Sequence, residues 1–249
     1  MNAPFGEPLF YHPALGEREA VLADAEARHV AAQRLRSGDA IALFDGRGGF
    51  ARGRIAAVSR HAVHVHVLER GEAVETRPAF DVYSAVPKGD RQAVLLDMAT
   101  QLGMHRFVPV AWTRGVVEPG ARARERWRRI CIEACKQSRR LHVPDIRAPI
   151  PLADAVAHAR REGARLLLAH VSPEARPALG IPELRAPDAE RYALFVGPEG
   201  GVTPEEVALL RAHGAGVIAL SDAVLRVETA VAAVLALARG AWQAAGAGA

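Results

Sequence analysis

Apolar residues recur along this chain in short runs, and the spacing of the runs changes near residue 79. In the first part, strand-like runs cover Asp39–Asp45, Phe50–Val58 and Ala62–Leu68, and turns separate them. Several short strands divided by turns are typical of a small β-barrel. A helix is expected before these strands at Asp24–Leu35, with Asp24 as its N-cap.

In the second part, strand-like runs alternate with longer segments of helical spacing. The expected strands are Phe80–Val86, Arg106–Ala111, Arg165–His170, Tyr192–Val196 and Gly216–Leu220. The expected helices are Arg91–Leu102, Arg122–Arg139, Leu152–Glu162, Thr203–His213 and Glu228–Trp242. For the helix from Thr203 we expect Thr203 as N-cap, Pro204 at the first position and Glu206 completing a capping box. This alternation predicts an α/β fold in which helices cover a parallel sheet.

The change of pattern also suggests where the domains divide. Residues 69–78 are polar and include Gly71 and Pro78, which is typical of a connecting segment. We therefore expect one domain at residues 1–72, a linker at 73–79 and a second domain at 80–249.

Two loops of the second part stand out as candidate binding elements. The strand ending at Val196 runs into Gly-Pro-Glu-Gly-Gly at residues 197–201, and the last strand runs into Ser-Asp-Ala-Val-Leu-Arg-Val-Glu at 221–228. Ligands of open α/β sheets bind at the carboxyl ends of the strands, and glycines let the backbone approach a ligand closely. The two loops are therefore predicted to form one site.

Composition narrows the class of protein. The chain has 249 residues, of which 50% are hydrophobic and 24% charged, as in globular proteins. No apolar run is long enough for a membrane span, and the first ten residues lack the pattern of a signal peptide. These features favour a cytoplasmic protein that does not enter a membrane.

Positive charge is concentrated in one segment. The formal net charge is +4, but residues 122–140 alone contain eight Lys or Arg against two acids. A solvated helix face and a phosphate-binding surface are both compatible with this pattern.

Other chemistry has less support. The glycine loop matches neither the dinucleotide fingerprint nor the P-loop, so a neutral or cationic adenosine-like ligand fits better than a phosphate. Cys131 and Cys135 lack further ligands at zinc spacing, and His64 and His66 fit a solvated strand face. No metal site and no hydrolase motif is expected.

Arg226 and Glu228 precede or begin the last helix. An acid there favours the helix dipole, whereas a cation is mildly unfavourable. Arg226 is therefore the more informative residue, and its planar guanidinium suits an acidic ligand group or an RNA phosphate.

Taken together, the motifs resemble those of one enzyme family over nearly the whole chain. The two loops resemble the signature loops of SPOUT-class RNA methyltransferases, and residues 133–144 (EACKQSRRLHVP) are similar to the E-A-x-x-Q-S-x-R-x-x-V-P segment of the RsmE family, the 16S rRNA (uracil-N3) methyltransferases. Further matches are Lys88 with Arg91, Thr100–Gly103, His29, Leu35-Arg36 and Gly38-Asp39.

The resemblance implies a PUA-like RNA-binding β-barrel followed by a SPOUT domain, which has a parallel sheet, helices on both faces and a deep trefoil knot. It implies a homodimer that uses S-adenosyl-L-methionine to methylate N3 of uridine 1498 of 16S rRNA in the small (30S) ribosomal subunit.

The resemblance also assigns roles to residues. The expected cofactor-binding residues are His170, Gly197, Glu199, Gly200, Leu220, Ser221, Leu225 and Arg226. The expected RNA-binding residues are Arg28, Arg34, Arg36, Lys88, Arg91, Lys136, Arg139 and Arg140. Arg226, Glu228 and Glu199 are the catalytic candidates, and no general base can be singled out among them.

Two positions depart from the family pattern. Ser221 stands where glycine is usual, and Gln101 where glutamate is frequent. A Cβ at residue 221 would restrict positive φ angles, so the shape of that loop is open. Two other functions also remain open: methylation of another RNA such as tRNA, and a non-catalytic RNA-binding role in ribosome assembly.

Overall fold

The computed structural model describes residues 6–117, 119–180, 182–185 and 188–247. These residues divide into two compact units. The first contains the chain up to Glu75 together with residues 132–143, and the second contains residues 76–131 and 144–249. A continuous first domain was expected, whereas the first unit also includes a segment from the middle of the chain.

The first unit is built on a five-stranded sheet in the order β1-β3-β4-β5-β2. Its elements are β1 (Leu9–Tyr11), β2 (Glu19–Ala23), α1 (Asp24–Ala32), β3 (Ala40–Phe44), β4 (Gly49–Val58) and β5 (Ala62–Glu72). Strand β1 is parallel to β3, and the other neighbours are antiparallel. The sequence patterns predicted β3, β4 and β5 but missed β1 and β2, which are short.

The N-cap predicted for α1 is wrong by one residue. Ala23 occupies the cap position, with extended backbone and no capping side chain. Asp24 is the first helical residue and has a φ of 49°. The helix is instead anchored through Ala27 and Val30, which are buried against the sheet with Phe10 and Leu22.

The second unit contains the predicted parallel sheet, in the order β11-β13-β10-β12-β6-β7-β8. Its strands are β6 (Ala79–Ser84), β7 (Arg106–Ala111), β8 (Asp145–Ile146), β9 (Ile150–Pro151), β10 (Arg165–Ala169), β11 (Arg176–Pro177), β12 (Arg191–Val196) and β13 (Gly216–Ala219). All pairings are parallel, and the short β9 pairs with β7 beyond the end of β8.

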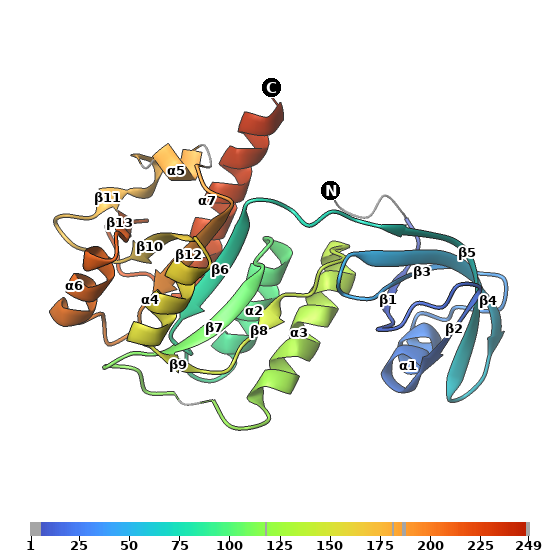
Figure 1. Ribbon diagram of the computed structural model, residues 1–249. Coiled ribbons are helices and arrows are strands. Elements are labelled where there is room, and N and C mark those ends of the chain that lie inside the picture. The colour runs from blue at the N-terminus through green and yellow to red at the C-terminus, as the bar shows by residue number, and fades with distance from the viewer. Residues whose placement is uncertain (1–5, 118, 181, 186–187, 248–249) are drawn as a thin grey trace. The chain divides into compact units, whose positions relative to one another are not determined.

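Helices cover both faces of this sheet (Figure 1). They are α2 (Arg91–Gln101), α3 (Ala123–Ser138), α4 (Leu152–Arg161), η1 (Ala178–Gly180), α5 (Pro182–Arg185), α6 (Pro204–Ala212) and α7 (Val227–Ala247). Helices α2 and α7 pack together on one face, and α4 and α6 lie on the other. Strand residues alternate between these layers: Tyr83 and Phe195 stack on the α4 side, whereas Phe80 stacks on Trp242 of α7.

Candidate functional site at the carboxyl ends of three strands

Three neighbouring strands of the second unit end around one pocket. Strand β10 lies between β13 and β12 in the sheet, and all three run in the same direction. The loops that follow them therefore leave the same edge of the sheet. The two loops singled out from the sequence meet here, and the residues after β10 lie between them.

The pocket has a volume of about 190 Å³ and a largely apolar wall. The side chains and backbone around it come from Ala169, His170, Val171, Val196, Gly197, Pro198, Glu199, Gly201, Val202, Ile218, Leu220, Ser221, Ala223, Val224, Leu225, Val227 and Ala230. This set includes six of the eight predicted cofactor-binding residues. Gly200 and Arg226 are not among the lining residues.

The glycine loop is fixed by the start of α6. Thr203 and Glu206 form the predicted capping box, in which each side chain bonds the backbone N–H of the other residue. The second carboxyl oxygen of Glu206 accepts a hydrogen bond of 2.8 Å from the backbone N–H of Thr113. A cap and a crossing contact thus position the turn that precedes the helix.

Close packing explains the glycines in this loop. A Cβ at Gly197 would lie 2.3 Å from a methyl group of Val202. A Cβ at Gly200 would lie 3.2 Å from Cβ of Arg114, whose guanidinium donates a hydrogen bond of 3.1 Å to the Gly200 carbonyl. Gly201 has a φ of 83°, which favours glycine. Arg114, to which no sequence motif pointed, therefore holds the loop through its contacts with Gly200.

The second loop tolerates a side chain at residue 221. Positive φ angles outside glycine occur, among the described residues, only at Asp24, Arg34 and Arg139. Ser221 therefore has an ordinary backbone conformation, and its hydroxyl accepts a hydrogen bond of 3.1 Å from the Ala223 N–H. The serine stabilises the turn without requiring the freedom of glycine.

The other departure, Gln101, lies on the surface of α2. Its amide donates a hydrogen bond of 2.8 Å to Asp97, one turn earlier in the helix.

Ionisable groups lie within and beside the pocket. Burial, with a contribution from Arg211, lowers the pKa of His170, so this wall residue is neutral at pH 7. Arg91 donates a hydrogen bond of 3.5 Å to Glu199. Glu228 is buried, and within the described parts of the chain its Oε2 atom has no hydrogen-bond partner. Arg226 is exposed at the start of α7.

The predicted RNA-binding cations fall into two structural groups. Arg28, Arg34, Arg36 and Lys88 are exposed, and Arg91 is partly exposed. Lys136, Arg139 and Arg140 instead lie within the first unit, where Lys136 and Arg139 contact other residues of that unit.

Lys136 is buried and its ammonium group lies 2.9 Å from Glu26 and 2.6 Å from Glu133. The guanidinium of Arg139 donates a hydrogen bond of 3.1 Å to the Glu7 carbonyl. Burial lowers the pKa of Arg140, whose Nε has no partner among the described residues. These contacts connect residues 136–140 to the N-terminal sheet, and the assignment to RNA stays a prediction.

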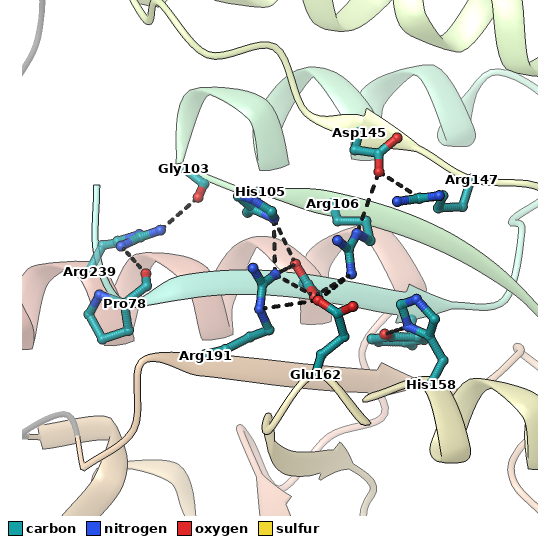
Figure 2. A network of polar contacts seen from close by, with 12 residues as sticks. Pro78, Gly103, His105, Arg106, Asp145, Arg147, His158, Glu162, Arg191 and Arg239 are labelled. Carbon is teal, nitrogen blue, oxygen red and sulfur yellow. Dashed lines mark hydrogen bonds and ion pairs between the residues drawn. The ribbon is translucent and has the colours of Figure 1, made fainter. Parts of the chain in front are cut away.

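At the opposite, amino-terminal ends of the strands lies a second polar cluster (Figure 2). The Asp81 carboxylate is 1% exposed and lies 2.9 Å from Arg191, 3.0 Å from His105 and 3.4 Å from Arg106. Burial disfavours the charge of Arg106, yet Asp81 and Glu162 together raise its pKa. Each charge here is matched by another, which indicates a structural role.

A buried hydrogen bond extends this cluster. The hydroxyl of Tyr83 lies 2.7 Å from Nδ1 of His158. Burial and the nearby Asp81 raise the pKa of Tyr83 to about 12, so the hydroxyl keeps its proton at neutral pH. Burial and Arg106 lower the pKa of His158.

Within the described residues, no helix is both long and apolar enough to span a membrane. Over the same residues, no three His, Cys, Asp or Glu side chains gather as metal ligands would.

Comparison with known proteins gives consistent matches over most of the chain. Residues 75–239 match the family model of an RNA methyltransferase domain, and residues 22–68 match that of an RNA methyltransferase PUA domain. The ribosomal RNA small subunit methyltransferase E of Mycobacterium tuberculosis is 33% identical over 240 residues, which cover 91% of this chain and 89% of the relative.

Two solved structures are similar over nearly their full length. One is the ribosomal RNA small subunit methyltransferase E of Neisseria gonorrhoeae bound to S-adenosyl methionine, with a TM-score of 0.84, 28% identity and coverage of 95% of this chain and 98% of that one. The other is a Legionella pneumophila protein in complex with S-adenosylmethionine, with a TM-score of 0.85, 26% identity and coverage of 96% and 99%.

Proposed function

Because the chain belongs to the ribosomal RNA small subunit methyltransferase E family, we propose that it transfers a methyl group from S-adenosylmethionine to N3 of uridine 1498 in 16S rRNA. The observation that carries this proposal is the pocket formed by the loops after β10, β12 and β13. We propose the small ribosomal subunit as the substrate particle and the cytoplasm as the location.

The residues of the pocket suit this cofactor. Apolar walls such as Val202, Ile218 and Leu225 fit a flat heteroaromatic ring, and the backbone of residues 197–201 offers polar groups to its edge. A neutral His170 leaves the pocket free of added positive charge, which favours a cationic sulfonium ligand. When bound, S-adenosylmethionine supplies an electrophilic methyl group.

The chain's own groups would position the nucleotide and manage its proton. Uracil N3 carries an imide proton that must leave, and it lies on the Watson–Crick edge, so the base must be unpaired or extruded. Arg226 is proposed to orient the cofactor or the nucleotide, and Glu199 and Glu228 are the candidate bases. Lys88 and Arg91 are proposed to face the RNA or the developing uracilate.

The assembly and topology remain proposals. We propose a homodimer and a trefoil knot in the second unit. The strand order supports the knot, because β13 enters between β11 and β10 before α7 returns to pack on β12 and β6.

Methyl transfer from radiolabelled S-adenosylmethionine tests the proposed reaction. Isolated small subunits lacking the modification, naked 16S rRNA and bulk tRNA are compared as acceptors, and the modified nucleoside is identified after digestion. We expect 3-methyluridine in the 16S rRNA. Methylation of tRNA alone, or cofactor-independent RNA binding without methyl transfer, would refute the proposal.

The Arg226→Ala variant tests the assigned role of this exposed residue. We expect a loss of methyl transfer of at least 100-fold with unchanged thermal unfolding, because the side chain packs in no core. Arg161→Ala, at an exposed position of α4, is the matched control. Near-normal turnover of Arg226→Ala would remove Arg226 from the site.

A further inference from the structure

The positive charge of the whole chain is concentrated in residues 122–129, which comprise the residue before α3 and the first two turns of this helix. Residues 122–129 contain five arginines and one glutamate. Their net charge of +4 equals that of the entire protein, since the other 241 residues carry 27 basic and 27 acidic groups. The segment is therefore an isolated basic surface on an otherwise balanced molecule.

All five arginines are exposed, and the helix orders them. Arg122, Arg126 and Arg129 recur at helical spacing along one face, and Arg124 and Arg128 form an adjacent row. Trp127, on the inward face, is 3% exposed and packs edge-on against Phe107. Because Trp127 is buried on the inward face of the helix, the arginines on its other faces lie toward solvent.

The first row borders a surface groove. The groove has a volume of about 790 Å³ and is lined by Gly120, Ala121, Arg122, Ala123, Glu125, Arg126 and Arg129. Besides Glu125 and three arginines, the lining contains only Gly and Ala. Guanidinium groups are therefore most of the polar side-chain groups in the groove.

Intramolecular contacts do not account for the charges of Arg122, Arg124 and Arg126. Arg129 pairs with Glu125 one turn away, but in the described part of the chain the side chains of Arg122, Arg124 and Arg126 make no ion pair or hydrogen bond. Cations in the first turn of a helix also oppose its dipole. The arginines therefore cost helix stability, and an external anion is the simplest compensation.

We propose that residues 122–129, at the start of α3, form a docking surface for the sugar-phosphate backbone of the RNA substrate. This inference rests on the proposed function, which supplies an RNA, and it adds a contact surface outside the family motifs in residues 133–144. The planar guanidinium matches phosphate oxygens in pairs. Phosphate contacts position a nucleic acid without reading its sequence, so the surface anchors the RNA while the pocket selects the base.

A nucleic acid fits this surface better than a protein does. Stable protein interfaces place aromatic or large apolar anchors at their centre, whereas the groove lining contains only Gly and Ala besides its charged residues. An acidic protein partner is the alternative that the experiment must separate.

The test uses the double variant Arg122→Ala/Arg126→Ala in the full-length protein. The matched control is Arg160→Ala/Arg161→Ala, which removes the same charge from the exposed end of α4. Affinity for naked 16S rRNA is measured at several salt concentrations. Each lost phosphate contact should reduce the slope of log K against log salt by about 0.7 to 0.9, so we expect a reduction of about 1.5 for the double variant and little change for the control.

Steady-state kinetics provide the second readout. The KM for RNA should rise at least fivefold, with the KM for S-adenosylmethionine and the kcat at saturating RNA unchanged. Arg122→Lys/Arg126→Lys should restore most of the salt slope.

Three results would overturn the inference. The first is an unchanged salt slope in Arg122→Ala/Arg126→Ala, and the second is an equal reduction of the slope in the control variant. The third is a binding defect seen with assembled subunits but not with naked rRNA, which would indicate a ribosomal protein as partner. Failure of the wild type to methylate rRNA, with the salt effect present, would refute the proposed function alone.

Discussion

Replacing Asp81 should destabilise the second unit more than any change at its surface. Asp81 contacts two arginines, and its carboxylate is 1% exposed. The side chains of Arg106 and Arg191 are only 9% and 14% exposed. In Asp81→Asn the volume is kept, but the charge is lost and an N–H donor can face the guanidinium groups.

The magnitude follows from what remains buried. Breaking a buried ion pair from one side costs about 3–5 kcal/mol, because the remaining charge is left uncompensated. Glu162 lies 3.5 Å from Arg106 and 3.8 Å from Arg191, and Asp145 lies 3.6 Å from Arg106. Both carboxylates are more than one third exposed, so they compensate the two arginines only in part. We therefore expect a loss of about 3–4 kcal/mol in the free energy of unfolding.

Urea unfolding followed by tryptophan fluorescence measures this loss. All three tryptophans, at 112, 127 and 242, belong to the second unit, so the signal reports on the unit that contains Asp81. With a slope of about 2 kcal/mol per molar urea, the midpoint should fall by roughly 1.5–2 M. Glu190→Ala, at an exposed position beside Arg191, should change the free energy by no more than about 0.5 kcal/mol.

A paired replacement tests the cause. Asp81→Leu deprives both Arg106 and Arg191 of their buried carboxylate, whereas in Asp81→Leu/Arg191→Met only Arg106 loses it. The double variant should therefore be less destabilised than Asp81→Leu. A loss below about 1 kcal/mol for Asp81→Asn, or additive losses in the pair, would refute the reasoning that the network acts through charge compensation.

Three further predictions concern the pocket and its neighbourhood. Gly197→Ala should weaken S-adenosylmethionine binding at least tenfold by calorimetry, because its Cβ would lie 2.3 Å from Val202. The control Gly240→Ala, with open space around the new Cβ, should bind the cofactor normally. Equal affinities of the two variants would contradict the packing argument. Cofactor affinity should fall as the pH is lowered below about 6.5 and His170 acquires a charge that burial disfavours, and His170→Asn should remove this dependence. The pKa of His158 is also lowered in the folded state, so this residue binds a proton more readily in the unfolded chain, and its contribution to stability is present above about pH 6.5 and is lost at lower pH. The free energy of unfolding of His158→Asn should therefore decline less than that of the wild type between pH 7 and 5. An equal decline in the two proteins would exclude His158 as the cause.

The sequence alone determined the local elements and the place of the site. Thr203, Pro204 and Glu206 encode a helix start through contacts three residues apart, and the structure confirms that capping box. The alternating pattern predicted the parallel sheet, since strands buried on both faces are apolar throughout. Residues 197–201 and 221–228 are predictable as pocket loops because glycines and polar groups follow the ends of two strands.

Only the tertiary structure decided which neighbours these residues acquire. The insertion of β10 between β12 and β13 places His170 and Val171 in the pocket wall, and pairing order depends on contacts distant in sequence. The same holds for the basic residues of 122–140. Lys136 is buried in an ion pair with Glu26, 110 residues away, whereas the five arginines between residues 122 and 129 are exposed. The sequence determines which residues carry a charge, but packing determines whether a charge is neutralised inside the protein or remains available to a ligand.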